Sequence, residues 1–534
     1  MNDLLRILSI LFLVSSGINA KAEDFNIINY GAVGDSITLN SNAIQKAIDQ
    51  CFDSGGGKVI VPSGKFITGT IILKDNVTLH LDQGAELIGS LDLKDYKNID
   101  PFTEGLGIDV GWALVVAVDA RNIAVEGEGT IDGRGKAIKE KQIQTDTRSE
   151  GKRWGDRPFL LRIVRCSGVS VSGVSLKFAG AWTSHYSQST HIQIRDLKIN
   201  SVGVAHNDGI GIDGCQHVRI ENCDVVSGDD ALVFKTTWSK MACKDIQVTG
   251  MRLKSNQAGI KMGTESMANF EDISISDCYI YDTKNGGIKL LTVDGAHLRN
   301  VEISEITMDN VRTPILFRLG SRLSVFRKGQ DIQQPTGTLE NVVIRNVKAK
   351  ASAEAQLKPP SGILITGVPG HDIINLTLED IEISLAGGGT LEDARHPVAE
   401  AIDKYPEVKT FGPTIPAYGV WARHVNGLKL TNIRFTLDSN DLRPAIVCED
   451  GKHVTLDGLE LPGTTGNEEI IRFENVDGAT VKSVDTKANS LTMLRVEGEG
   501  SDNIALKKNT DWKVQHAQTC GKRVPQEAVK FITK

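Results

Sequence analysis

Three aspartates in two short segments of the chain are the strongest candidates for chemistry. Asp208 lies in the segment 206–213, and Asp229 and Asp230 are adjacent in the segment 227–230. Carboxyl groups gathered on a rigid surface can act as a general acid and a general base. Cleavage of a glycosidic bond needs a pair of carboxyl groups of this kind.

The sequence around these aspartates predicts short strands in a repeating pattern. From about residue 113, an apolar strand, a polar turn, a second alternating strand and another turn recur at a period of roughly 20 to 28 residues. The units are rich in β-branched residues and lack a helical period, and the frame of leucine-rich repeats is absent. We therefore predict an all-β fold, a single-stranded right-handed parallel β-helix whose coils stack ~4.8 Å apart.

Stacking would bring the aspartates together. Asp229 follows Asp208 by 21 residues, close to one coil, so the three carboxyl groups should share one surface, where their mutual repulsion raises at least one pKa. His206 and Asp208 would lie on one face of a strand. A Gly-Asp-Asp sequence also occurs in turns and calcium sites, and that alternative stays open.

The beginning of the chain has the features of an export signal. Residues 1–22 contain a basic residue, an apolar run at 7–14 and a small-x-small cleavage site at 20–22. The apolar run is shorter than the ~20 residues that cross a membrane. We expect a periplasmic or secreted protein without a membrane anchor; a frayed helix of a cytosolic protein is the alternative.

The predicted domains follow from the repeats. Residues 23–112 would form an N-terminal cap and the first coils, 113–510 the main β-helix with the site, and 511–534 a C-terminal tail. A short helix at 41–51, capped by Ser41, would cover the apolar end of the solenoid. Three insertions interrupt the repeat and should form loops on the binding side, at 136–157, 319–337 and 386–417.

Composition limits the partners. The formal net charge is -7, and no basic excess indicates nucleic acid. The eight cysteines have no metal-ligand spacing, so we expect neither a metal nor a cofactor. Cys215 and Cys223 are the closest pair for a disulfide bond, but packing of the cysteines as small apolar residues is the favoured interpretation.

Several motifs resemble glycoside hydrolase family 28, the polygalacturonase family. They run from about residue 25 to past 310 and include "FNIINYGAVGDS" at 25–36, "GEGTIDGRG" at 127–135, "HNDGIGIDGC" at 206–215, "SGDDALVFK" at 227–235, "QAGIKMGTES" at 257–266 and "GGIKLLTVDG" at 286–295. The resemblance implies that Asp229 is the general acid, and that Asp208 and Asp230 hold and deprotonate the attacking water with inversion of configuration. It also implies that Lys289 binds substrate.

Three positions depart from the family pattern. The family's histidine falls on Ala258, its arginine on Gly287 and its first asparagine on His206. We hypothesise that His206 partly replaces the missing histidine; the alternative is a solvated surface residue. The missing arginine leaves open whether the substrate is polygalacturonate, rhamnogalacturonan or a substituted galacturonan.

Further substrate-binding candidates lie on neighbouring coils and loops. Lys261 and Lys289 are 28 residues apart and should stack beside the aspartates, unless they belong to a solvated outer face. The other candidates are His185 and Trp182 on the preceding coil, Arg318, Arg322, Arg327 and Lys328 in a basic loop, and the rings of Tyr405, Phe411, Tyr418 and Trp421.

Together these features predict a monomeric, secreted glycoside hydrolase acting on an acidic, pectin-type polysaccharide. The long insertions favour attack at chain ends over internal attack. A pectate-lyase-like enzyme on the same fold is one alternative, but no arginine lies in the aspartate segments to remove a proton. A non-catalytic glycan-binding β-helix is the other.

Overall fold

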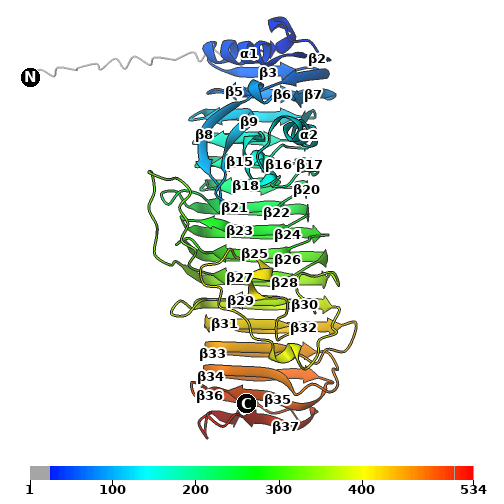
Figure 1. Cartoon of the computed structure of the whole chain (residues 1–534), viewed down its shortest axis with the longest axis vertical. Helices are drawn as coiled ribbons and strands as arrows, with labels where there is room; N and C mark the ends of the chain where they lie inside the picture. The colour runs from blue at the N-terminus through cyan, green and yellow to red at the C-terminus, as the bar shows by residue number, and fades with distance from the viewer. Residues whose placement is uncertain (1–23, 510, 533–534) are drawn as a thin grey trace, which may run out of the picture.

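Short strands stack in parallel columns along the whole of the described chain. The computed structural model describes residues 24–509 and 511–532, so the expected signal peptide lies outside it. Strand β18 (Ile210–Asp213) pairs in parallel with β15 (Ser184–Ser187) on one side and with β21 (Leu232–Thr236) on the other. Figure 1 shows the same stacking from end to end. The predicted single-stranded parallel β-helix is confirmed.

The core is built from ladders of apolar side chains. Val169, Ile192, Val218, Ile246 and Ile273 occupy equivalent positions on successive coils, and all are buried. β-branched side chains pack well on such a pleated surface, which explains why the repeat is rich in them. In the described chain no helix is long and apolar enough to cross a membrane.

Asparagine and aspartate residues bend the chain within the long strands β24 (Phe270–Tyr281) and β26 (His297–Val311). Asn300 has φ of 55°, and Asp272 on the preceding coil has φ of 54°. These two side chains tolerate the left-handed backbone conformation better than bulky ones. The Asn300 amide also donates to Asp272 Oδ1 at 3.0 Å, so the bends are linked from coil to coil.

One hairpin departs from the parallel pattern. β8 (Lys97–Thr103) and β9 (Asp109–Val118) pair antiparallel, while β9 also continues the column through β12 (Phe159–Val164). Glu104 holds the turn of this hairpin, because its carboxylate accepts the N–H groups of Leu106 at 2.9 Å and Ile108 at 3.0 Å. The turn is thereby fixed beside the solenoid wall.

Helix α1 (Ser41–Asp53) covers the N-terminal end, with Ile44, Ala47, Ile48 and Cys51 buried against the first coil. The predicted role of Ser41 is wrong, because Asn40 is the N-cap residue. The Ser41 hydroxyl instead accepts the N–H of Gly69 at 2.7 Å and so joins the helix to the first coil.

The other end of the solenoid extends further than predicted. β37 (Lys513–Cys520) pairs with β35 (Asn489–Glu497), and β38 (Val529–Ile532) pairs with β36 (Asp502–Lys507). The segment after residue 510 is therefore not a tail but a further coil. No disulfide bond joins the cysteines: seven are buried and free, as the packing interpretation predicted, and Cys520 is exposed.

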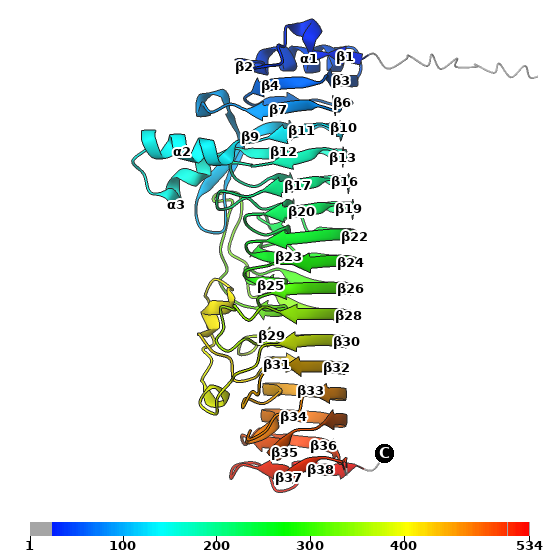
Figure 2. The ribbon, with the colours of Figure 1, turned by 90° about the vertical axis from the view of Figure 1, so that its right-hand side faces the viewer.

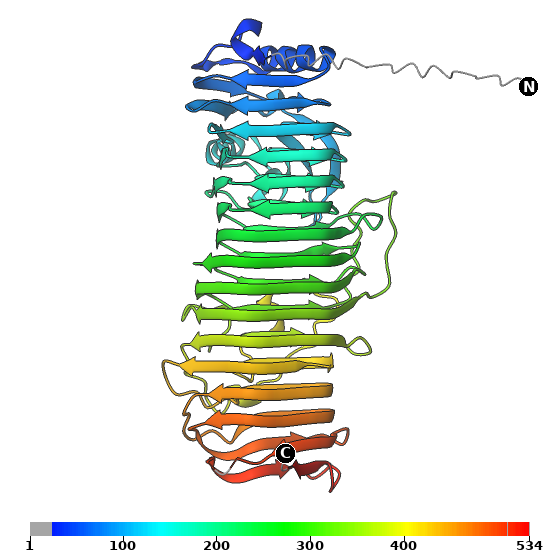
Figure 3. The ribbon, with the colours of Figure 1, turned by 180° about the vertical axis from the view of Figure 1, so that it is seen from behind.

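Two of the three predicted insertions lie on one side of the solenoid. The first forms helices α2 (Gly135–Thr145) and α3 (Glu150–Arg153), and the insertion at 386–417 is mostly irregular. Figure 2 shows both projecting from the same side of the solenoid, whereas the view from behind in Figure 3 shows regular, uncovered strands.

We predict that Ile48→Ala lowers the free energy of unfolding by about 2 to 5 kcal/mol, because it leaves a cavity between α1 and the first coil. Lys46→Ala, on the exposed side of the same helix, should change it by less than about 0.5 kcal/mol. Urea titration measures both variants. Equal effects of the two substitutions would show that the helix does not seal the core.

Candidate active site

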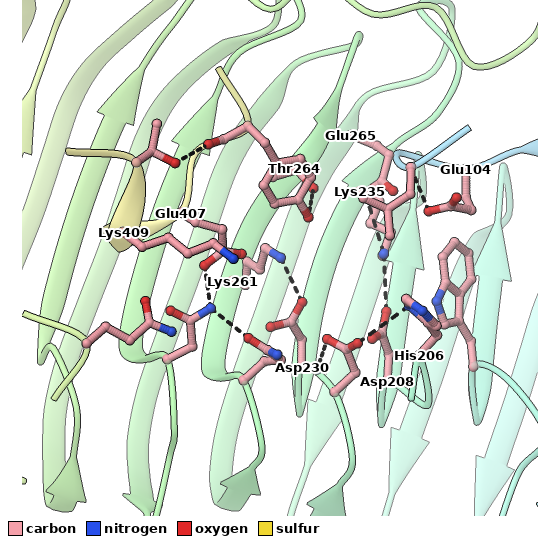
Figure 4. Close-up of a pocket in the computed structure, with 18 residues that line it drawn as sticks. Glu104, His206, Asp208, Asp230, Lys235, Lys261, Thr264, Glu265, Glu407 and Lys409 are labelled. Carbon is pink, nitrogen blue, oxygen red and sulfur yellow. Dashed lines mark hydrogen bonds and ion pairs between the residues drawn. The ribbon is translucent and has the colours of Figure 1, made fainter. Parts of the chain in front are cut away.

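The three aspartates meet on the outer face of one strand column. Asp208 lies two residues before β18 and Asp230 two residues before β21, and these strands pair with Ile210 opposite Leu232. The backbone N–H of Gly209 donates to the Asp230 carbonyl at 2.8 Å, which continues this register to the aspartates. One oxygen of each of Asp208, Asp229 and Asp230 lies within 4.8 Å of the others (Figure 4).

Two glycines allow this close approach. A Cβ atom on Gly209 would lie 2.4 Å from the Ala231 carbonyl oxygen, and one on Gly228 would lie 2.1 Å from Asn207 Oδ1. Any side chain at either position would push apart the two coils that carry the acids. The glycines in the two aspartate motifs therefore set the spacing of the carboxyl groups.

Two buried lysines balance the acids. Lys235 Nζ lies 3.1 Å from Asp208 Oδ2 and 3.4 Å from Glu265 Oε2, and Lys261 Nζ lies 2.9 Å from Asp230 Oδ2. Asp230 also accepts the N–H of Ala258 at 3.1 Å. A nearby positive charge favours the ionised carboxylate.

Asp229 differs from its two neighbours because no lysine pairs with it. Burial, with the charges of Asp208 and Asp230, holds the pKa of Asp229 well above its usual range. Burial raises the pKa of Asp208 to about 6, although Lys235 opposes the rise. Asp229 is therefore the carboxyl group of the three that has no cationic partner and a pKa held high, which is the property that a general acid requires.

The carboxyl groups line a cavity of about 440 Å³, within the range of roughly 300–1,000 Å³ typical of small-molecule sites. Its wall comes from the coils, from the β8–β9 turn and from the insertion at 386–417. Beyond the three aspartates, the lining includes Glu104, Trp182, His206, Lys235, Gln257, Lys261, Glu265, Asn285, Gln356, Tyr405, Glu407, Lys409 and Thr410.

Those three carboxyl groups are also close enough to hold a cation. Carboxylate oxygens are ligands that divalent cations accept. Lys235 and Lys261 already neutralise two of the three, however, which weakens the attraction for a metal ion.

His206 lies beside Asp229, with Nδ1 3.9 Å from Oδ2, and its ring stacks on Trp154 with the centroids 4.1 Å apart. The prediction that His206 lies on a strand is wrong. It lies in a bend between strands, with φ of 63°. Burial lowers the pKa of His206 to about 4, so the imidazole is neutral at pH 7. The neutral ring therefore shields Asp229, the general-acid candidate, without placing a positive charge beside it.

The two candidates from the preceding coil differ. Trp182 lines the cavity, and Lys235 Nζ lies 4.0 Å from the centroid of its ring. His185 is fully buried and does not line the cavity; its Nε2 lies 3.3 Å from Asp213 Oδ2. His185 therefore supports the wall and cannot touch a bound sugar.

The lysines stack as predicted, since Lys261 and Lys289 are direct neighbours in the ladder between β23 (Ala258–Ser266) and β25 (Gly286–Thr292). Lys261 reaches the cavity. Lys289 is 1% exposed and lies outside the cavity lining, with Nζ 3.2 Å from Glu407 Oε2. It is a buried partner of the insertion rather than a free substrate contact.

The predicted sugar contacts of Arg318 and Arg322 are not supported. The Arg318 guanidinium is buried and donates to Thr366 Oγ1 and to the carbonyls of Gly367, Glu400 and Ala401. Arg322 donates to both oxygens of Asp294, at 2.9 and 2.6 Å. Both arginines therefore anchor loops, because their guanidinium groups are used by carbonyl, hydroxyl and carboxylate oxygens of the protein itself.

Among the aromatic candidates, only Tyr405 lines the cavity, where its hydroxyl accepts a hydrogen bond from Thr264 Oγ1 at 3.0 Å. Phe411, Tyr418 and Trp421 are buried in hydrophobic clusters. Phe411 of the insertion lies against Trp421 of β31 (Val420–Asn426), with the ring centroids 6.3 Å apart, whereas Tyr418 belongs to the main core of the solenoid.

Five charged residues of the cavity were not among the predicted site residues, namely Glu104, Lys235, Glu265, Glu407 and Lys409. Lys235 is the last residue of the motif at 227–235. Its place in a strand, three residues after Leu232, could have indicated that it belongs to the site. Burial with Glu265 next to it raises the pKa of Glu104 to about 7. Glu104 and Glu407 come from irregular segments, whose folding no repeat pattern predicts.

Comparison with known proteins gives a family match. Residues 51–400 match the profile of "Glycosyl hydrolases family 28". The chain is 27% identical over 315 residues to a probable polygalacturonase of Vitis vinifera, a match that covers 56% of this chain and 63% of that protein. It is 23% identical over 400 residues to an exopolygalacturonase of Zea mays, covering 70% of this chain and 87% of that protein.

The fold is also similar to a solved structure. The crystal structure of a hyperthermoactive exopolygalacturonase from Thermotoga maritima superimposes with a TM-score of 0.59 at 21% identity, over 78% of this chain and 92% of that chain. At this identity the likeness supports the β-helix fold alone.

We predict that His206→Ala lowers the pKa of Asp229, because water then reaches a carboxyl group that the ring now covers. NMR titration of ¹³C-labelled aspartate carboxyls measures the change. His217→Ala, an exposed histidine on another strand column, should leave the titration as in the wild type. An unchanged or raised pKa in His206→Ala would contradict the assigned shielding role.

Proposed function

The chain belongs to glycosyl hydrolases family 28, and from this premise we propose that it is an exported enzyme that hydrolyses glycosidic bonds of a pectin-type polysaccharide. The main support is that three carboxyl oxygens lie within 4.8 Å of one another in a cavity. One of these carboxyl groups, Asp229, has a pKa held well above its usual range. We propose that the enzyme acts as a monomer, in the periplasm or outside the cell.

In the proposed mechanism, Asp229 donates its proton to the glycosidic oxygen as the bond to the anomeric carbon breaks. Asp208 and Asp230 hold a water molecule on the opposite face of the sugar and accept its proton as its oxygen bonds to that carbon. The product would then have inverted configuration. This part of the proposal rests on the family resemblance, since carboxyl oxygens within 4.8 Å of one another are closer than the roughly 6.5–9.5 Å usual for inverting enzymes. Lys235 and Lys261 support this division of roles, because their charges favour the ionised forms of Asp208 and Asp230.

We predict that Asp229→Asn lowers kcat by about 10²- to 10⁴-fold, the usual contribution of a positioned general acid, while oligosaccharide binding remains. Asp224→Asn, an exposed aspartate five residues earlier on the preceding strand, is the matched control and should retain the wild-type rate. Release of reducing ends from pectic oligosaccharides measures both.

Other outcomes identify the two alternatives. An ultraviolet-absorbing, unsaturated product from the wild type would indicate β-elimination by a lyase. Tight binding of the oligosaccharide by the wild type without any release of reducing ends would indicate a glycan-binding protein.

We further propose that the enzyme acts at chain ends. The insertion at 386–417 contributes Tyr405, Glu407 and Lys409 to one side of the cavity, and the β8–β9 turn contributes Glu104 to another. A cavity of about 440 Å³ bounded in this way suits the end of a chain better than a polymer that passes through.

Under this proposal, a time course on defined pectic oligosaccharides should show one short product from the earliest time point. Blocking the terminal sugar should stop its release, because the cavity then has no free chain end to accept. Chromatography of the products measures both. An early mixture of intermediate lengths, unaffected by blocking, would indicate internal attack instead.

A further inference from the structure

Three lysines in and behind the wall of the cavity pair with the protein's own carboxylates. Lys235 pairs with Asp208 and Glu265, Lys261 pairs with Asp230, and the ladder neighbour Lys289 pairs with Glu407. To reach any of these three ammonium groups, an incoming sugar carboxylate would have to displace a carboxylate that is already in place. Lys409, an exposed lysine of the lining, has no ion pair within the described chain.

Glu407 occupies the position where a sugar carboxylate beside Lys289 would lie. Its side chain is 16% exposed, its Oε2 lies 3.2 Å from Lys289 Nζ, and it also accepts a hydrogen bond from Asn285 Nδ2. Burial opposes its ionisation, but Lys289 and Lys261 together lower the pKa of Glu407 below its usual value. The residue therefore presents a fixed negative charge at this end of the cavity.

The cavity as a whole has more acids than bases. Its lining includes six carboxyl side chains and three lysines, namely Glu104, Asp208, Asp229, Asp230, Glu265 and Glu407 against Lys235, Lys261 and Lys409. Asp229 and Glu104 have raised pKa values, but the other four carboxyl groups still outnumber the three lysines of the lining. Like charges placed together without a counter-ion repel, so the cavity disfavours a further carboxylate on the substrate beside Glu407.

The polar groups beside Glu407 suit hydroxyl groups. Gln257, Asn285 and Gln356 offer amides, and Thr410 offers a hydroxyl, all in the lining of the cavity. Amides and hydroxyls both donate and accept hydrogen bonds, as sugar hydroxyls do, and the Glu407 carboxylate accepts them. Figure 4 shows Glu407 and Lys261 on one side of Asp230 and His206 on the far side of Asp208.

We propose that the sugar ring bound between Lys261 and Glu407 carries no free carboxylate, and that Glu407 is the residue that excludes one. The inference rests on the proposed function and refines its substrate: the bond cleaved joins a pectic chain to an uncharged sugar ring. That ring is a neutral sugar or a uronate whose carboxyl group is esterified, since both present the same uncharged surface.

The test compares three oligosaccharides: oligogalacturonate, its methyl ester, and an oligosaccharide in which galacturonate alternates with a neutral sugar. The wild type should cleave the alternating substrate with a kcat/KM at least about tenfold above that of oligogalacturonate. Glu407→Gln should reduce this ratio by about tenfold, because it removes the repelling charge and frees Lys289. The methyl ester, if cleaved as well as the alternating substrate, identifies esterified uronate as an accepted occupant; otherwise the occupant is a neutral sugar.

Glu392→Gln is the matched control, since Glu392 lies in the same insertion, is exposed and does not line the cavity. It should leave the ratio unchanged. Calorimetric binding of the three oligosaccharides to Asp229→Asn protein gives the same selectivity without catalysis and without any change at position 407.

The outcomes separate the two proposals. A wild type that prefers oligogalacturonate, or a Glu407→Gln enzyme with an unchanged ratio, overturns the role of Glu407. Selective binding of the uncharged sugar by Asp229→Asn protein, together with no cleavage of any oligosaccharide by the wild type, supports the inference and overturns the proposed hydrolysis.

Discussion

Parallel hydrogen bonding between successive coils is the constraint on which the rest of the structure depends. It aligns Ile210 with Leu232 and Leu232 with Ile260, so residues more than twenty positions apart become direct neighbours. A shift by one residue would turn the apolar ladder outward and the carboxyl groups inward. The buried ladders oppose such a shift. The hydrophobic core therefore fixes the relative positions of the carboxyl groups in the site.

The second constraint is electrostatic. Three carboxyl groups this close cannot all ionise without compensation, and the chain supplies two lysines for them from the same strand column. Lys235 follows Asp230 by five residues, and Lys261 comes from the next coil. Because only two of the acids receive a partner, the third keeps a raised pKa. This uneven pairing supports the proposed division of roles, in which one acid and two bases come from chemically identical residues.

Much of the solenoid and the meeting of the aspartates could be predicted from the sequence. The repeat predicts coil stacking, and a separation of 21 residues then places Asp208 beside Asp229. What failed were residues whose role depends on non-repeating segments. Ser41 precedes a helical pattern yet bonds to Gly69, and Arg318, predicted to bind substrate, is buried and donates to carbonyls of the insertion. The repeat in the sequence does not predict the partners of side chains that contact such segments.

This difference between wall and loop has a functional consequence. The proposed catalytic groups stand at strand ends, where any displacement would cost core packing, whereas Glu407 and Tyr405 stand on an insertion held by the buried rings of Phe411 and Trp421. If the proposed roles hold, substitutions on the insertion change which sugar the cavity accepts without moving the aspartates. At Gly287, by contrast, a Cβ atom would lie 2.5 Å from Met308 Sδ and 2.7 Å from the Pro314 carbonyl oxygen, so the wall leaves no room for a longer side chain there. The proposed division between substrate choice and bond cleavage therefore follows from which residues lie inside the repeat.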